Sequence, residues 1–172
     1  MKNTKVTIAG VEFKNPVMTA SGTFGSGMEY SEFVDLNCLG AVVTKGVANV
    51  PWEGNPTPRV QETYGGMLNA IGLQNPGIDV FIERDIPFLK QFDTKIIVNV
   101  CGRTAADYVE GVEKLGDQPV DMLEINVSCP NVKEGKPSCH SCGGSCTCGG
   151  SGNADAELVS AITKKVMEQL GL

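Results

Sequence analysis

The chain has 172 residues, a length that predicts one domain, and its 41% hydrophobic content is ordinary for a globular protein. Twenty acidic against fourteen basic residues give a net charge of -6, which argues against nucleic acid and anionic membranes as partners, because both attract basic surfaces. No apolar run approaches the roughly 20 residues of a membrane-spanning helix, and the first residues lack the apolar core of a signal peptide. We therefore expect a cytoplasmic protein.

The first quarter of the sequence predicts short strands and one helix. Residues 4–8 and 11–13, separated by Gly10, predict a small hairpin. Residues 17–20 then predict a buried strand, residues 21–27 a loop of small residues, residues 28–36 a helix and residues 41–45 a second buried strand. The run at 41–45 is apolar without alternation, as expected for a strand covered on both faces.

The middle of the chain begins with a long irregular segment. Residues 46–75 are rich in Gly, Pro and Asn, and loops of this length are uncommon and usually functional. Pro76 can open a helix that continues to about Phe92. The remaining sequence predicts a strand over 95–100, a helix over 104–115, a strand over 121–127, an irregular segment over 128–153 and a helix over 154–170.

This alternation of strands and helices predicts an α/β fold. Polar side chains follow four separate strands at their carboxyl ends: Ser21, Lys45, Asn99, and Asn126 with Cys129. Four contributing strands favour a (β/α)8 TIM barrel over an open doubly wound sheet, which gathers its ligands at one crevice. A complete barrel needs about 250 residues. We therefore expect residues 1–172 to form a single partial domain with about four βα units, a half barrel.

Five motifs in register resemble one enzyme family. They are Ala20–Thr23 (ASGT), Thr44–Gly46 (TKG), Asn69–Gly77 (NAIGLQNPG), Ile97–Val100 (IVNV) and Asn126–Asn131 (NVSCPN). In this order they resemble the class 1 dihydroorotate dehydrogenases, and most of all subtype B. The resemblance runs from about residue 5 to Gly135.

The resemblance implies an FMN-dependent oxidoreductase that converts dihydroorotate to orotate in de novo pyrimidine biosynthesis. This oxidation removes a proton from C5 and a hydride from C6 of the substrate, and the family assigns the proton to a loop cysteine and the hydride to the flavin. The matching residue is Cys129. A thiol, whose ordinary pKa is about 8.5, is a competent base when a modest fraction is thiolate. Considered without its neighbours, a free cysteine is more often a small buried hydrophobe.

The resemblance also assigns the binding residues. For the substrate these are Lys45, Asn69, Ala70, Ile71, Gly72, Leu73, Asn126 and Asn131, and for the flavin Ser21, Lys45, Gly46, Asn99 and Asn126. Carboxamides carry donors and acceptors that suit the alternating N–H and C=O edge of a pyrimidine, and a lysine can hold an anionic substrate or a reduced flavin. The alternatives are asparagines that cap turns and a lysine that extends to solvent.

Partners follow from the same resemblance. The catalytic subunit of subtype B works with an electron-transfer subunit that carries FAD and an iron–sulfur centre and passes electrons towards NAD. A half barrel also exposes sheet edges, which predicts a homo- or hetero-oligomer.

Residues 136–153 form a Gly/Ser/Cys-rich segment. Cys139, Cys142, Cys146 and Cys148 crowd together there, and in a reducing cytosol such crowding indicates metal binding before disulfides. They could hold zinc or an iron–sulfur centre; the alternative is a flexible segment over the site. Two other functions stay open: a non-catalytic half-barrel assembly module that binds metal, and a related flavin-dependent dihydropyrimidine dehydrogenase.

Overall fold

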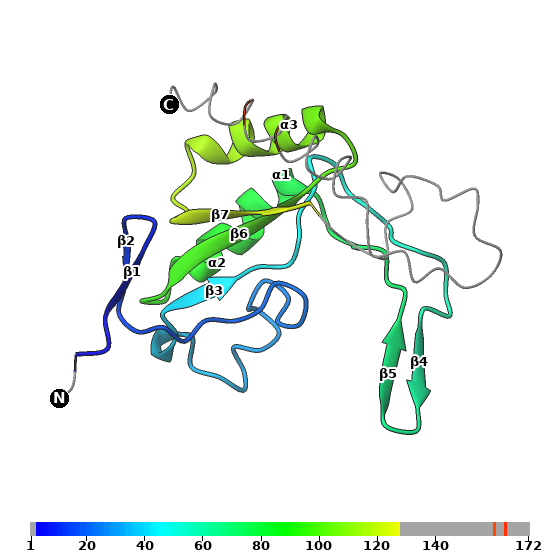
Figure 1. Ribbon diagram of the computed structural model, residues 1–172, viewed down its shortest axis with the longest axis horizontal. Coiled ribbons are helices and arrows are strands. Elements are labelled where there is room, and N and C mark those ends of the chain that lie inside the picture. The colour runs from blue at the N-terminus through cyan, green and yellow to red at the C-terminus, as the bar shows by residue number, and fades with distance from the viewer. Residues whose placement is uncertain (1–2, 128–159, 161–163, 165–172) are drawn as a thin grey trace.

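A three-stranded parallel sheet lies at the centre of the molecule. The computed structural model describes residues 3–127, Ser160 and Lys164. The sheet has the order β3-β6-β7 and consists of β3 (Ala41–Val43), β6 (Lys95–Cys101) and β7 (Met122–Asn126) (Figure 1). Val43 pairs with Ile97, and Cys101 pairs with Asn126, so the carboxyl ends of all three strands lie at one edge. The α/β prediction is confirmed, as are the strands predicted over 95–100 and 121–127.

Helices cover one face of this sheet (Figure 1). One continuous helical segment contains α1 (Ile78–Val80), the π-helical turn η2 (Phe81–Asp85) and α2 (Ile86–Leu89). Pro87 explains the wide turn, because it has no N–H and its ring crowds the carbonyl four residues earlier. The last helix is α3 (Ala105–Gly116), and Thr104 and Asp107 form a capping box at its start. Both helices agree with the sequence prediction.

Alternation along β6 divides the core into two layers. Ile96, Val98 and Val100 point towards the helices and belong to the main apolar cluster, which also contains Phe81 and Leu89. Ile97 points to the opposite face and packs with Phe13, Ala41 and Val43. Asn99 and Cys101 follow Ile97 on this second face. Their side chains therefore point away from the helices.

Two hairpins flank the sheet. The predicted amino-terminal hairpin is present as β1 (Val6–Ile8) and β2 (Val11–Phe13), and Phe13 is buried beneath the sheet. The second hairpin, β4 (Val60–Thr63) and β5 (Gly66–Asn69), lies inside the predicted loop 46–75 and was missed. It projects from the body of the molecule, and all eight strand residues are exposed (Figure 1).

Two predictions near the amino terminus are wrong. The strand expected over 17–20 is reduced to one bridge between Met18 and Ala41. The helix expected over 28–36 consists of turns, and a short 3-10 helix, η1 (Leu36–Cys38), begins only at its end. The apolar residues of this segment form no buried stripe, since Phe33 is 80% exposed, and an unpacked helix of this length is unstable in water.

Other predictions fall outside the described residues. The irregular segment 128–153 lies wholly outside, and of the helix predicted over 154–170 only Ser160 and Lys164 are described, both of them helical. In the part of the chain that is described, no helix is both long and apolar enough to cross a membrane.

Candidate functional site at the carboxyl edge of the sheet

A chain of hydrogen bonds joins the polar side chains of β6 and β7. The Asn99 side-chain amide donates to the Glu124 carboxylate, and the Asn126 amide donates to Asn99 Oδ1 over 3.3 Å. Asn99 is only 2% exposed, so its amide is fixed inside the protein. The Tyr108 hydroxyl of α3 donates to the main-chain carbonyl of Asn126 over 2.5 Å and holds the end of β7. The two predicted asparagines are therefore in direct contact.

Lys45 and Gly46 lie beside these asparagines. A Cβ atom added to Gly46 would lie 2.8 Å from Asn99 Oδ1, so only glycine allows the backbone to approach the amide this closely. The Lys45 N–H donates to the Gly25 carbonyl over 2.8 Å, which joins the end of β3 to the loop that contains Ser21. The structure thus places the backbone at 45–46 next to the tips of β6 and β7.

The loop of the Asn69–Gly77 motif returns to the same place. The Leu73 side chain approaches Gly46, where its Cδ2 atom would lie 3.4 Å from an added Cβ, and it packs against Trp52 and Cys101. Leu73 has a φ of 51° after Gly72 with a φ of 76°. A left-handed backbone is uncommon for a bulky residue and costs on the order of 1–3 kcal/mol, and such strain is concentrated at functional sites.

Asn75 holds this strained loop. Its Nδ2 donates to the Leu73 carbonyl over 2.8 Å, while its Oδ1 accepts from the backbone N–H groups of Ala48 and Gly77 over 3.1 and 3.0 Å. Asn75 is 6% exposed. One buried side chain therefore fixes Leu73 relative to the segment that follows Gly46.

Asn55 and Arg59 hold the preceding part of the loop. The Asn55 backbone donates to the Ile71 carbonyl over 2.9 Å, and its side chain donates to the Ala70 carbonyl over 2.7 Å. Arg59 donates to the Asn55 carbonyl over 3.2 Å and also bonds the Gln74 side chain. The backbone of residues 70–72, which the sequence predicts to contact a ligand, is thereby anchored by hydrogen bonds from Asn55.

Not every predicted residue joins this cluster. Asn69 lies at the end of β5 on the exposed hairpin, and Ser21 lies in a turn. Cys129 and Asn131 lie outside the described residues, as do the four candidate metal ligands Cys139, Cys142, Cys146 and Cys148. Their predicted roles therefore remain predictions.

Sequence reasoning missed four residues that hold the site: Asn55, Arg59, Asn75 and Glu124. Asn75 lies within a recognised motif, yet only its position beside the positive-φ pair Gly72 and Leu73 indicates its role as a brace. Glu124 precedes Asn126 by two residues on a strand and therefore shares its face, which is the one signal the sequence offered. Asn55 and Arg59 carry no local signal.

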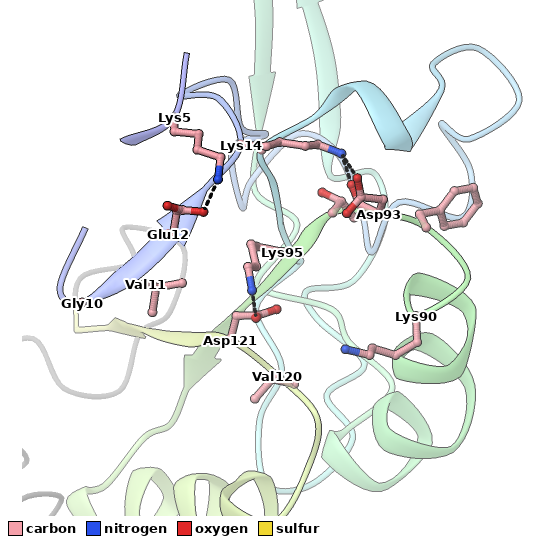
Figure 2. A pocket seen from close by; sticks show the side chains of 13 residues that line it. Lys5, Gly10, Val11, Glu12, Lys14, Lys90, Asp93, Lys95, Val120 and Asp121 are labelled. Carbon is pink, nitrogen blue, oxygen red and sulfur yellow. Dashed lines mark hydrogen bonds and ion pairs between the residues drawn. The ribbon is translucent and has the colours of Figure 1, made fainter. Parts of the chain in front are cut away.

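A cavity of about 790 Å³ lies at the opposite, amino-terminal edge of the sheet (Figure 2). Ion pairs line it: Lys5 with Glu12 at 2.7 Å, Lys14 with Asp93 at 3.1 Å and Lys95 with Asp121 at 2.8 Å. The predicted site residues are absent from its walls. In parallel α/β proteins ligands bind at the carboxyl ends of strands, so this cavity is not the candidate site.

Parallel strands whose carboxyl tips bring two carboxamides together, beneath a strained loop, define an α/β protein with a polar ligand site at that edge. The sequence matches the family described as dihydroorotate dehydrogenase over residues 3–166. The chain therefore belongs to the dihydroorotate dehydrogenase family. The match extends past Gly135 to residue 166.

Relatives give the same family with high identity. The chain is 76% identical over 133 residues, 77% of its length, to a protein of Lachnoclostridium phytofermentans, and 64% identical over 167 residues, 97% of its length, to one of Alkaliphilus metalliredigens. Both relatives carry the name dihydroorotate dehydrogenase B (NAD(+)), catalytic subunit. These alignments cover 44% and 52% of the two relatives, so the chain spans about half of their length.

A solved structure supports the fold. The structure of a DHODH from Eimeria tenella in complex with ferulenol superposes with a TM-score of 0.66 and covers 98% of this chain and 45% of the other. The sequence identity is 21%, so the likeness concerns the fold alone.

Proposed function

We propose that this chain is the first half of a (β/α)8 barrel in the catalytic subunit of a dihydroorotate dehydrogenase of subtype B, which oxidises dihydroorotate to orotate with FMN in pyrimidine biosynthesis. The observation that best supports the proposal is the hydrogen bond between Asn99 and Asn126, together with the close approach of Gly46 to Asn99. The names of the two relatives support the reaction, the NAD acceptor and an electron-transfer partner subunit. Residues 1–172 then form one partial barrel domain of a cytoplasmic, oligomeric enzyme.

The described residues fit a flat, polar-edged cofactor. Asn99 and Asn126 offer carboxamide donors and acceptors at the strand tips, and Gly46 brings the backbone close to Asn99 without a side chain in between. We assign the FMN ring to these three residues, together with Ser21 and Lys45. When bound, FMN supplies the hydride acceptor that amino-acid side chains lack.

The substrate is assigned to the neighbouring loop. Asn55 and Asn75 donate to the carbonyls of Ala70, Ile71 and Leu73, so the loop that also contains Gly72 is fixed before the carboxylate and ring of the substrate reach it. The substrate side chains are Lys45, Asn69, Asn126 and Asn131. The Lys45 cation balances the carboxylate of the substrate, and the asparagines bond the edge of its ring.

Cys129 is assigned the proton transfer. It lies three residues after Asn126, the last residue of β7, and Tyr108 holds the main-chain carbonyl of Asn126 in place. As thiolate, its sulfur takes the C5 proton of dihydroorotate while the C6 hydride leaves to the acceptor.

The proposal is tested with the full-length protein and its electron-transfer subunit. We expect one FMN per catalytic subunit and orotate formation that depends on dihydroorotate and reduces NAD. Dihydrouracil and dihydrothymine serve as the control substrates. Turnover of either of these in preference to dihydroorotate, or a protein without flavin that carries zinc, would contradict the proposal and favour one of the alternative functions.

A further inference from the structure

Glu124 lies at the start of the hydrogen-bond chain at the sheet edge. It pairs with Asn99 in the register of β6 and β7, and its carboxylate accepts from Asn99 Nδ2. Asn99 Oδ1 in turn accepts from Asn126 Nδ2 over 3.3 Å. Three side chains therefore form a directed series that ends at the tip of β7.

The carboxylate determines the direction of this series. A carboxamide that rotates by 180° exchanges its donor and acceptor at little steric cost, so an asparagine alone does not specify which group meets a ligand. An ionised carboxylate only accepts hydrogen bonds, and Asn99 must therefore turn its Nδ2 to Glu124. The Oδ1 atom of Asn99 then faces Asn126, and Asn126 must donate to it from Nδ2.

We propose that Glu124 is a positioning residue that fixes the orientation of both carboxamides, so that Asn126 presents its Oδ1 acceptor to a ring N–H of the bound ligand. This inference rests on the proposed function, because it takes a flat heterocycle at the carboxyl edge as the ligand. It adds a specificity rule: the ligand must offer a donor, not an acceptor, to Asn126.

Two further contacts make the arrangement rigid. The Tyr108 hydroxyl holds the main chain of Asn126 from the helix side, so β7 cannot shift to compensate for a rotated amide. Gly46 packs within contact distance of Asn99 Oδ1, and that close approach leaves little space for the amide to turn. With the backbone fixed, the Glu124 acceptor decides the orientation.

The test compares variants in the full-length, FMN-loaded protein. Glu124→Leu and Glu124→Met remove the acceptor, Glu124→Gln keeps a carbonyl acceptor but adds an NH₂ donor that can also face Asn99, and Glu113→Leu on the exposed face of α3 is the matched control. Orotate binding is followed through the flavin absorbance. We expect the dissociation constant for orotate to rise about tenfold in the Leu and Met variants, the value of one hydrogen bond, to rise less in the Gln variant and to stay near wild type in the control.

A second readout needs no cofactor. In the flavin-free protein, the side-chain NH₂ of Asn99 should exchange with solvent faster in the Leu and Met variants than in wild type, by nuclear magnetic resonance. Unchanged exchange or unchanged orotate binding in the Leu and Met variants, or equal weakening in the Glu113→Leu control, would overturn the inference. A wild-type protein that binds neither FMN nor orotate would instead refute the proposed function, while the exchange measurement still decides the role of Glu124.

Discussion

At the residue scale, the buried side chain of Asn75 connects three separate points of the backbone. Its three hydrogen bonds reach Leu73, Ala48 and Gly77, and its removal would leave buried backbone groups without partners. Each such group costs about 1–3 kcal/mol, so we expect Asn75→Ala to lower the free energy of unfolding by about 2–4 kcal/mol.

Denaturant unfolding measures this loss, and Asn49→Ala is the matched control. Asn49 bonds Glu110 at the surface, where one hydrogen bond contributes little. An equal decrease in the free energy of unfolding in the two variants would show that Asn75 does not stabilise the Leu73 loop more than a surface asparagine does.

Gly46 gives a second prediction at this scale. In Gly46→Ala the new methyl group would meet Asn99 Oδ1 at 2.8 Å, so the amide or the strand must move. Overpacking of this kind costs about 1–3 kcal/mol, which corresponds to FMN binding about tenfold weaker. Gly65→Ala is the control, because an added Cβ there has no neighbour within 4 Å. FMN affinity, followed by flavin fluorescence, should be unchanged in the control. If Gly46→Ala also bound FMN with wild-type affinity, Gly46 would not be part of the cofactor site.

The third prediction concerns the proton transfer assigned to Cys129. If its thiolate takes the substrate proton, Cys129→Ala should lower kcat about 10²- to 10⁴-fold, the usual contribution of a positioned base. FMN content and orotate affinity should change little, because the assigned cofactor contacts lie on other residues. Steady-state orotate formation with a flavin count measures both. A variant with wild-type kcat would show that another group moves the proton.

At the scale of elements, the start of α3 makes stability depend on pH. Burial raises the pKa of the Asp107 carboxyl, but hydrogen bonds from the N–H groups of Arg103 and Thr104, at 2.8 and 3.0 Å, outweigh it and lower that pKa below its ordinary value of 3.8. A depressed pKa in the folded state stabilises the protein above the unfolded pKa, and this stabilisation is lost as pH falls through the folded pKa.

Asp107→Asn tests this directly. The difference in unfolding free energy between wild type and variant should be constant from neutral pH to about pH 4 and should shrink below it, as urea unfolding over a pH series would show. A difference that grows as the pH falls would contradict the assigned sign.

Elements with local signals were predictable from the sequence. The helix predicted over 104–115 and the strand predicted over 95–100 lie close to the observed bounds of α3 and β6, because α3 has one buried apolar face and β6 contains the apolar run 96–98. The hairpin 60–69 was missed because its strands are fully exposed and show no buried alternation. The helix over 28–36 was wrong because apolar spacing alone cannot show whether a face finds a partner in the fold.

The site divides in the same way. The proximity of Lys45, Gly46, Asn99 and Asn126 could be predicted, since each follows or ends a strand and parallel strands bring their carboxyl ends together. Asn55, Arg59, Asn75 and Glu124 could not, because they act through hydrogen bonds to partners distant in sequence or across a strand pair.

For the whole molecule, the two edges of the sheet have different roles. The amino-terminal edge holds the ion-paired cavity between the first hairpin and the starts of β6 and β7, and such contacts stabilise the fold (Figure 2). The carboxyl edge holds buried carboxamides and a strained loop. In parallel α/β enzymes the chemistry takes place at the carboxyl edge, and the proposed function assigns the ligands of this chain to that edge.

A crystal structure of the full-length protein with FMN and orotate tests this account most directly. It should place the flavin ring against Asn99, Asn126 and Gly46, with Cys129 Sγ and Lys45 Nζ lining one pocket around orotate. A flavin bound in the cavity beside Lys95, or a Cys129 sulfur and a Lys45 amine on opposite sides of the molecule, would contradict it.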